Sequence, residues 1–363
     1  MIELKESGDI LNKKKRVLLG MSGGVDSSVA AYLLQNDGYE VVGATMKLWE
    51  PGDDDKNQAI VDAKKVADRL GVEHHIVDFQ DDFKKNVVSR FIDEYFEGKT
   101  PNPCVFCNKN IKFEKMFEVA DKLNCDYVAT GHYARMEYND EKGLYELKRA
   151  SSDKKDQTYM MYNLDQKKMA RILFPIGNYD KSVIRKIAEE IGLEVYNKPD
   201  SQDICFVPDQ DYEAFLKTYS EKKVKKGRFL DSDGNKLGEH NGIISYTIGQ
   251  RKGLGITFGK PTYVIGINGE DNSIILGDNE DLFKSELIAC EVNFLDMNID
   301  EMEAPRVVES KIRYSSKLSK ATVTKIGDRR VSVVFETPQR AITSGQSVVF
   351  YDGDVLIGGG IIE

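Results

Sequence analysis

The first half of the chain alternates short apolar runs with stretches whose apolar residues repeat at helical spacing. The apolar runs predict buried strands over residues 16–19, 41–46, 76–79 and 127–130. The helical spacing predicts helices over 29–34, 59–70, 81–97, 108–123 and 181–191. This order of elements implies an α/β fold with a mostly parallel sheet covered by helices on both faces. Ligands on such sheets bind at the carboxyl ends of the strands.

After about residue 206 the pattern changes to short β-branched runs separated by turns such as Asp233-Gly234 and Asp352-Gly353. We therefore expect an all-β C-terminal half made of barrels or small sandwiches. Its expected strands cover 243–248, 263–267, 273–276, 307–312, 321–326, 331–335 and 347–351. The polar stretch 278–282 interrupts this half, so we place a domain boundary near residue 283.

Composition and charge narrow the class of protein. The 363 residues include 51 Lys and Arg against 60 Asp and Glu, a net charge of −9, which argues weakly against nucleic-acid binding through bulk charge but leaves a local basic surface open. No apolar run is long enough for a membrane helix, and the N-terminus lacks a signal core, so we expect a cytoplasmic protein with no membrane partner. The 5 cysteines indicate chemistry or burial rather than disulfides, and burial is expected for Cys125 and Cys290.

A glycine-rich turn follows the first predicted strand and precedes a helix. Such a turn exposes backbone N–H groups and a positive helix end to an anion, so it indicates a phosphate site. The serine hydroxyls add donors, and Asp26 could serve as a helix cap, lie near Mg²⁺, or do both. The alternative is a turn that binds nothing. The residues of this turn are Gly20, Met21, Ser22, Gly23, Gly24, Val25, Asp26 and Ser27, followed by Ser28.

Cys104 and Cys107 have CxxC spacing just before a predicted helix, after two prolines that hold the approach extended. A helix start lowers a thiol pKa and favours the thiolate. A structural zinc site would need more ligands, and a thioredoxin-like motif would need a different layout. Together with the distant Cys205, the pair could hold an iron–sulfur cluster with one open iron. Inert burial is the alternative for any one cysteine.

Taken together, these motifs resemble the bacterial tRNA-specific 2-thiouridylase family, a branch of the adenylating ATP pyrophosphatases with an SGGxDS loop. The resemblance spans nearly the whole chain. It is carried by GMSGGVDSSVAA at 20–31, TPNPC..CNK.IKF at 100–113, ATGHYAR at 129–135, KDQTYM at 155–160, LFPIG at 173–177, DSQDICF at 200–206, SYTIGQRKGLG at 245–255 and SGQSVVFYDGD at 344–354.

The resemblance implies a fold of three parts. The first is a Rossmann-like domain of the adenine nucleotide alpha-hydrolase type over residues 1–206, which binds ATP and thiolates. A small, mostly β domain over 207–282 follows, and then a tRNA-binding β-barrel over 283–363.

The resemblance also implies a reaction. Uridine 34 of tRNA, at the wobble position, would be adenylated at the expense of ATP and then converted to 2-thiouridine with release of AMP and pyrophosphate. Cys205 would carry a persulfide received from a cysteine desulfurase or sulfurtransferase, and Cys107 would be the second nucleophile. Met46 and Gly131 match adenosine-contact positions of the family, and they would join the loop in binding ATP with Mg²⁺.

The resemblance marks a set of positions for tRNA: Asn102, Pro103, Cys104, His132, Lys155, Asp156, Gln157, Arg313, Tyr314 and Gln346. Cations, amides and an aromatic side chain suit phosphate contacts and a base taken out of its stack. Two simpler interpretations remain open, because His132 could be a buried core histidine and Lys155 could belong to a solvated surface.

The chain departs from the common family pattern at one position, where Cys104 replaces an aspartate. An acid–base role is therefore left unassigned. Cys104, Cys107 and Cys205 could instead hold a [4Fe–4S] cluster that carries the transferred sulfur; the persulfide route is the one we favour. Two further hypotheses are another ATP pyrophosphatase acting on a small substrate and an RNA-binding module without catalysis.

Overall fold

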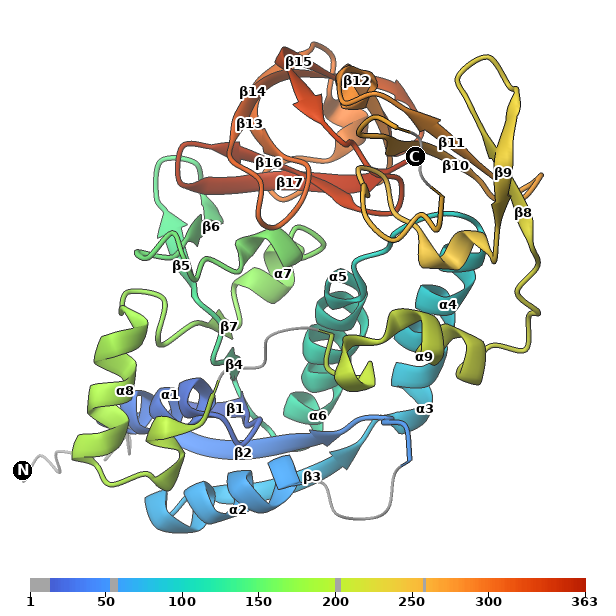
Figure 1. Ribbon diagram of the computed structural model, residues 1–363. Coiled ribbons are helices and arrows are strands. Elements are labelled where there is room, and N and C mark those ends of the chain that lie inside the picture. The colour runs from blue at the N-terminus through green and yellow to red at the C-terminus, as the bar shows by residue number, and fades with distance from the viewer. Residues whose placement is uncertain (1–13, 53–57, 200–203, 257–258) are drawn as a thin grey trace, which may run out of the picture.

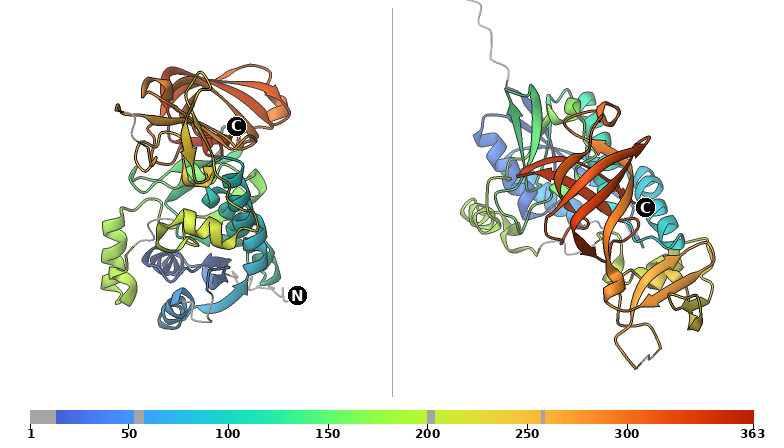
Figure 2. Two further views of the ribbon diagram at one scale, coloured as in Figure 1. Left: turned by 45° about the vertical axis from the view of Figure 1, so that its right-hand side comes forward. Right: turned by 90° about the horizontal axis from the view of Figure 1, so that it is seen from above.

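The computed structural model describes residues 14–52, 58–199, 204–256 and 259–363. These residues form three sheets, a parallel sheet with its helices at one end of the molecule, a barrel at the other end and a smaller sheet beside the barrel (Figure 1). Figure 2 shows the same division from two further directions. None of the helices in these residues is long and apolar enough to cross a membrane.

The N-terminal sheet is parallel throughout, as the alternation of strands and helices predicts. Its strand order is β3-β2-β1-β4-β7. The strands are β1 (Arg16–Gly20), β2 (Glu40–Lys47), β3 (Glu73–Asp78), β4 (Tyr127–Thr130) and β7 (Ile172–Leu173). Successive residues of a strand point to opposite faces. Accordingly, Val17 and Leu19 are buried in one hydrophobic cluster, and Leu18 is buried in another.

Helices cover both faces of this sheet. One face carries α1 (Val25–Asn36), α2 (Gln58–Leu70) and α8 (Lys181–Glu190). The other carries α3 (Gln80–Phe83), η1 (Lys84–Val88), α4 (Ser89–Phe96), α5 (Pro103–Cys107), η2 (Asn108–Lys115) and α6 (Met116–Lys122). The segments η1 and η2 are π-helical, a geometry frequent at functional sites.

The C-terminal strands form a closed barrel in the order β12-β15-β14-β13-β16-β17, because β12 also pairs with β17. They are β12 (Phe283–Phe294), β13 (Arg306–Lys311), β14 (Ser319–Gly327), β15 (Arg330–Arg340), β16 (Ser347–Asp352) and β17 (Val355–Ile362), with the short η8 (Ile299–Glu301) between β12 and β13. The sequence pattern did not predict the hairpin of β5 (Ala134–Asn139) and β6 (Leu144–Arg149). This hairpin extends the barrel sheet because β6 pairs with β17 (Figure 1).

The smaller sheet has the order β10-β11-β8-β9. Its strands are β8 (Gly227–Leu230), β9 (Lys236–His240), β10 (Tyr263–Asn268) and β11 (Ser273–Gly277). The remaining short elements are η3 (Thr158–Met160), α7 (Gln166–Met169), η4 (Glu194–Asn197), η5 (Pro208–Gln210) and η7 (Glu280–Leu282).

Two sequence expectations for this half are wrong. The run at 243–248 is not a strand but contains the 3₁₀ turn η6 (Ile243–Ser245). Ile243 and Ile244 are buried in different hydrophobic clusters, and a short apolar run does not by itself distinguish a strand from a buried turn. The half is also not all-β, because α9 (Tyr212–Tyr219) packs Phe215 and Leu216 into the core of the first domain.

Candidate active site

The glycine-rich turn lies where the sequence predicts, between β1 and α1 at the carboxyl edge of the sheet. Gly23 has φ +67° and lies against α2, where a Cβ would approach the Ala59 carbonyl oxygen to 2.5 Å. Ser27 Oγ accepts a hydrogen bond from Ser22 N at 3.2 Å. Gly24 is the N-cap residue of α1, and among the described residues no side-chain hydrogen bond caps this helix start. The N–H groups of this helix start therefore face an anion without competition from a cap.

Asp26 is the charged centre of the turn. Its carboxylate accepts hydrogen bonds from Lys181 Nζ at 2.8 Å to each oxygen and from Tyr133 OH at 2.8 Å. Sequence reasoning missed both partners. Tyr133 lies inside the ATGHYAR motif, which was a usable signal, whereas the start of α8 gives no local indication that Lys181 reaches the turn.

The structure brings the two expected adenosine-contact positions to this turn. A Cβ at Gly131 would lie 2.7 Å from Ser27 N, so a side chain there would collide with the start of α1. Met46, at the end of β2, faces Gly20, where a Cβ would lie 3.7 Å from its Cε. All three segments thus meet at the carboxyl ends of neighbouring strands, the usual ligand position of a parallel sheet.

The CxxC segment forms the short helix α5. Asn102 caps it, with its Oδ1 accepting a hydrogen bond from Cys104 N at 3.1 Å, and the buried Pro103 occupies the first turn. Asn108 Nδ2 donates to the Cys104 carbonyl at 2.9 Å. Cys104 is half-buried, whereas Cys107 is the last residue of α5 before the helix continues as η2, and it is buried.

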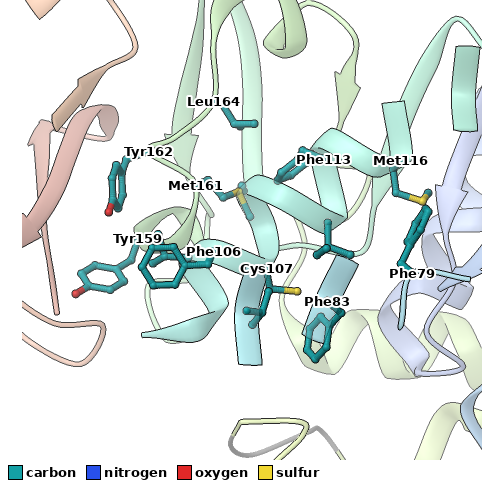
Figure 3. Packing of buried hydrophobic residues seen from close by; sticks show 14 of the residues in the cluster. Phe79, Phe83, Phe106, Cys107, Phe113, Met116, Tyr159, Met161, Tyr162 and Leu164 are labelled. Atoms are coloured by element: carbon teal, nitrogen blue, oxygen red, sulfur yellow. The ribbon is translucent and has the colours of Figure 1, made fainter. Parts of the chain in front are cut away.

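The expectation of low thiol pKa values at this helix start is wrong for Cys107. The residue lies among buried aromatic side chains, with Phe106 on one side and Phe83 on the other (Figure 3). Burial raises the pKa of the Cys107 thiol to about 12, although the nearby Lys112 lowers it. Because Cys107 lies beyond the first turn of a helix that starts at Pro103 and continues as η2, the positive helix end does not offset the loss of water.

Cys205 is exposed, and its electrostatic partners connect it to the same site. Loss of water around the sulfur and the nearby Cys104 raise the pKa of the Cys205 thiol, while Lys112 lowers it. Both thiols are affected by the charge of Lys112, and Cys205 also raises the pKa of Cys107, so the two cysteines share one electrostatic environment. The preceding motif residues 200–203 lie outside the described residues.

His132 is a buried residue, as its simpler interpretation expects, but its ring reaches the site. Its Nδ1 lies 2.8 Å from Thr130 Oγ1, and its Nε2 lies 3.4 Å from Lys112 Nζ. Phe113 and Phe174 flank the ring. Burial, with Lys112, lowers the pKa of His132 well below its usual value, so the imidazole is neutral at pH 7.

The positions expected for tRNA differ in their surroundings. Lys155 is half-buried. Asp156 is buried and accepts hydrogen bonds from Thr158 and from the Ala150 backbone, which makes it a fixed part of its loop. Gln157 Oε1 accepts from Tyr133 N at 2.9 Å, so the loop is tied to the residue that holds Asp26.

The barrel contributes three of the expected positions. Tyr314 is exposed and packs edge-on to Tyr159, and its pKa is raised by burial and by the charges of Asp156 and Cys104. Arg313 Nη2 donates to the Arg340 carbonyl. Gln346 Nε2 donates to the Thr100 carbonyl at 2.7 Å, just before the CxxC segment. The barrel therefore meets the cysteine-bearing segment.

The donor set fits the implied cofactors unequally. The Asp26 carboxylate and the Ser22 and Ser27 hydroxyls, whose oxygens lie 3.3 Å apart, are oxygen ligands of the kind that Mg²⁺ prefers. In the part of the chain that the structure describes, no group of three or more His, Cys, Asp or Glu side chains is placed to hold a metal ion. As positioned, Cys104, Cys107 and Cys205 do not form a cluster site. Of the two cysteines expected to be inert, Cys125 is buried and Cys290 is half-buried.

A parallel sheet with an anion-binding turn at its carboxyl edge, joined to a closed barrel, defines a nucleotide-binding α/β protein with added β domains. Three family models match the chain in agreement with this architecture. They are described as tRNA methyl transferase HUP domain, over residues 15–209, tRNA methyl transferase PRC-barrel domain, over 213–278, and Aminomethyltransferase beta-barrel domain, over 284–362.

Full-length relatives define the family. The chain is 55% identical over 358 residues to the tRNA-specific 2-thiouridylase MnmA of Clostridioides difficile, covering 96% of this chain and 98% of that protein. It is 50% identical over 359 residues to the protein of the same name from Acetivibrio thermocellus, covering 96% and 99%. The chain belongs to the tRNA-specific 2-thiouridylase family.

Similarity to solved structures is partial. The U34-tRNA thiolase NcsA from Methanococcus maripaludis overlaps 55% of this chain and 65% of its own, with a TM-score of 0.34 and 23% identity.

Proposed function

We propose that this protein is a tRNA-uridine 2-sulfurtransferase, which adenylates C2 of uridine 34 and replaces the oxygen with sulfur. The observation that carries the proposal is that two half-sites lie next to each other: a nucleotide half-site at the turn and a sulfur half-site at the cysteines. An anion-binding turn with Met46 and Gly131 lies at the carboxyl edge of the sheet. Cys107 and Cys205 share one electrostatic environment beside His132, the residue after Gly131.

The first half-reaction is adenylation. The turn Gly20–Ser27 would hold the phosphates of ATP through backbone N–H groups, with Met46 and Gly131 against the adenosine. The uridine O2 attacks the α-phosphorus and pyrophosphate leaves, so a poor leaving group becomes AMP. Mg²⁺ bound near Asp26 would shield the phosphate charge. Tyr133 and Lys181 fix the position of the Asp26 carboxylate beside the turn.

The second half-reaction is sulfur transfer. The terminal sulfur of a Cys205 persulfide attacks C2, the C2–S bond forms, and the electron pair of the broken C2–O bond leaves with AMP. The Cys107 thiolate then attacks Cys205 Sγ. The persulfide S–S bond breaks, 2-thiouridine is released and takes a proton at N3, and a Cys107–Cys205 disulfide remains. A thiol reductant must reduce that disulfide before the next cycle. Direct release of sulfide by Cys107 is the variant route.

Partners and domain roles follow from this assignment. Residues 1–206 would be the adenylating and thiolating domain, 207–282 a small central domain, and 283–363 the barrel that holds the anticodon stem-loop. The tRNA would contact the residues marked in the sequence, from Asn102–Cys104 and His132 through Lys155–Gln157 to Arg313, Tyr314 and Gln346. A cysteine desulfurase or sulfurtransferase would deliver sulfur to the exposed Cys205, in the cytoplasm.

Reconstitution tests the proposal. Purified protein is incubated with ATP, Mg²⁺, a sulfur source and unmodified tRNA, and nucleosides are analysed by mass for 2-thiouridine. We expect 2-thiouridine and tRNA-dependent AMP release. Cys205→Ser should lose thiolation and keep tRNA binding, whereas the control Cys290→Ser should retain both. Full thiolation by Cys205→Ser would remove the persulfide role, and AMP release without tRNA would point to a small substrate.

The persulfide route is separately testable against the iron–sulfur alternative. The protein is purified under anaerobic conditions and assayed for iron and acid-labile sulfide. We expect a colourless, iron-free protein that is fully active. Activity that requires about four irons per chain would assign Cys104, Cys107 and Cys205 to a [4Fe–4S] cluster instead.

A further inference from the structure

Lys112 contacts the nucleotide side of the site through His132 and acts on its cysteines through its charge, although no expected site position includes it. Its Nζ is 3.4 Å from His132 Nε2, beside the expected adenosine contact Gly131. Its charge acts on both nucleophiles, since it lowers the thiol pKa of Cys107 and of Cys205 against the effect of burial. This half-buried cation therefore contacts His132 on the nucleotide side and acts through its charge on the cysteines of the sulfur side.

The π-helical geometry of η2 brings Lys112 toward the side of the helix that bears Cys107. Lys112 follows Cys107 by five residues, and η2 covers Asn108–Lys115. In an α-helix, five residues make about 1.4 turns, so the two side chains would point apart. A π-helix joins residues five apart by its hydrogen bonds and brings them to one side. The wider turn therefore agrees with the effect of the Lys112 charge on the Cys107 thiol.

The neighbouring histidine leaves the positive charge on the lysine. Lys112 can only donate hydrogen bonds, so His132 Nε2 is the acceptor and Nδ1–H donates to Thr130 Oγ1. The ring is closed in by Phe113 and Phe174 and does not take a proton at neutral pH. The Lys112–His132 pair therefore has a charge of +1, and the fixed imidazole holds the ammonium group in position.

We propose that Lys112 stabilises the negative charge that moves from sulfur to the leaving AMP during thiolation. This inference rests on the proposed function. When the persulfide anion attacks C2, the C2–S bond forms and the C2–O bond breaks, and the charge passes from the terminal sulfur to the phosphate of AMP. A fixed cation that acts on both the attacking sulfur and the leaving phosphate stabilises the negative charge while it is shared between them in the transition state. Lys112 would act again when the Cys107 thiolate attacks Cys205.

The test separates charge from fold. Lys112→Met removes the ammonium group at similar length, and Lys112→Arg keeps a cation. Lys115→Met is the matched control, because Lys115 lies in η2 but pairs with Asp82 and Glu118. Each variant is loaded with labelled persulfide, and single-turnover transfer to tRNA is timed at saturating ATP. Binding constants for tRNA and ATP, together with thermal unfolding, are measured in parallel.

We expect Lys112→Met to slow single-turnover sulfur transfer about 100-fold, the scale of losing one charge-stabilising donor, with tRNA and ATP affinity changed less than about threefold. Lys112→Arg should recover at least about tenfold of that loss, and Lys115→Met should match the wild type. Transfer by Lys112→Met at the wild-type rate would overturn the inference, as would equal rates for the Met and Arg variants. If the wild type makes no 2-thiouridine, the proposed function fails and this inference with it.

Discussion

At the scale of single residues, the surroundings of a side chain change the chemistry that its sequence context suggests. A CxxC pair before a helix predicts easily ionised thiols, yet Cys107 is buried and its thiol pKa rises to about 12. Lys112 opposes this shift without cancelling it. Conversely, Asp26 suggests a helix cap or a metal ligand, and the structure holds it between Lys181 and Tyr133.

The Cys107 shift predicts a pH dependence of alkylation. A thiol reacts with iodoacetamide as the thiolate, and the folded-state pKa is raised, so ionisation moves to higher pH. Between pH 7 and pH 10 we expect the rate at Cys107 to rise about tenfold per pH unit without a plateau. Peptide mass spectrometry after timed alkylation measures it, with protein unfolded in urea as the control, which should plateau near pH 9. A plateau near pH 9 in the folded protein would contradict this prediction.

The Asp26 contacts predict a binding effect. Lys181→Met removes the cation that holds both carboxylate oxygens and leaves a charge beside the phosphate turn unpaired. We expect the Kd for MgATP to rise about tenfold, which corresponds to about 1.4 kcal/mol, as measured by calorimetry. Lys186→Met, on the exposed side of the same helix, is the control and should bind as the wild type does. Unchanged affinity in Lys181→Met would refute a role for this pair.

At the scale of elements, hydrogen bonds join the barrel to Thr100, in the segment that leads to the CxxC cysteines. Thr100 N donates to the Ser344 carbonyl at 2.9 Å, and Gln346 Nε2 donates to the Thr100 carbonyl at 2.7 Å. Gly345 has φ +86°, and a Cβ there would lie 3.0 Å from Lys99 Cβ, so the loop fits tightly. A residue expected to contact tRNA thus also joins two domains.

This contact between the barrel and Thr100 predicts an effect on stability in the absence of tRNA. Gln346→Ala removes one hydrogen bond across the domain contact, which contributes about 1 kcal/mol. We expect a lower unfolding midpoint in urea for the tRNA-free variant and faster proteolysis near residue 100. If the midpoint stays unchanged while tRNA affinity falls, Gln346 acts through tRNA alone.

At the scale of the whole molecule, the net negative charge of the chain opposes the binding of a negatively charged nucleic acid. The chain has a net charge of −9, yet its family acts on tRNA. We therefore expect tRNA binding to depend on local cations, among them the proposed contacts Lys155 and Arg313.

That arrangement predicts a strong salt dependence. Each phosphate contact releases counterions, so tRNA affinity should fall about tenfold between 50 mM and 200 mM KCl, measured by filter binding. Single-stranded RNA of matched length should bind more weakly at every salt concentration. A change of less than about twofold would mean that base and shape contacts, not phosphates, supply most of the affinity.

The sequence by itself determined the elements and the chemistry that local patterns encode. The apolar periodicity of β1 and the glycines that follow it predicted a strand, an anion-binding turn and a parallel sheet, because these depend on neighbours in the chain. Most barrel strands were also predicted from their β-branched runs. The strand predicted at 243–248 was wrong because Ile243 and Ile244 are buried by contacts with two separate hydrophobic cores.

Tertiary structure alone decided which distant residues meet. Lys181 reaches Asp26 across 155 residues, and Gln346 reaches Thr100 across 246, so no local pattern marks either contact. The pairing of β6 with β17 and the raised pKa of Cys107 have the same origin, because both depend on what packs around a segment. Strand and turn formation depends on neighbours in the chain, whereas a site depends on neighbours in space.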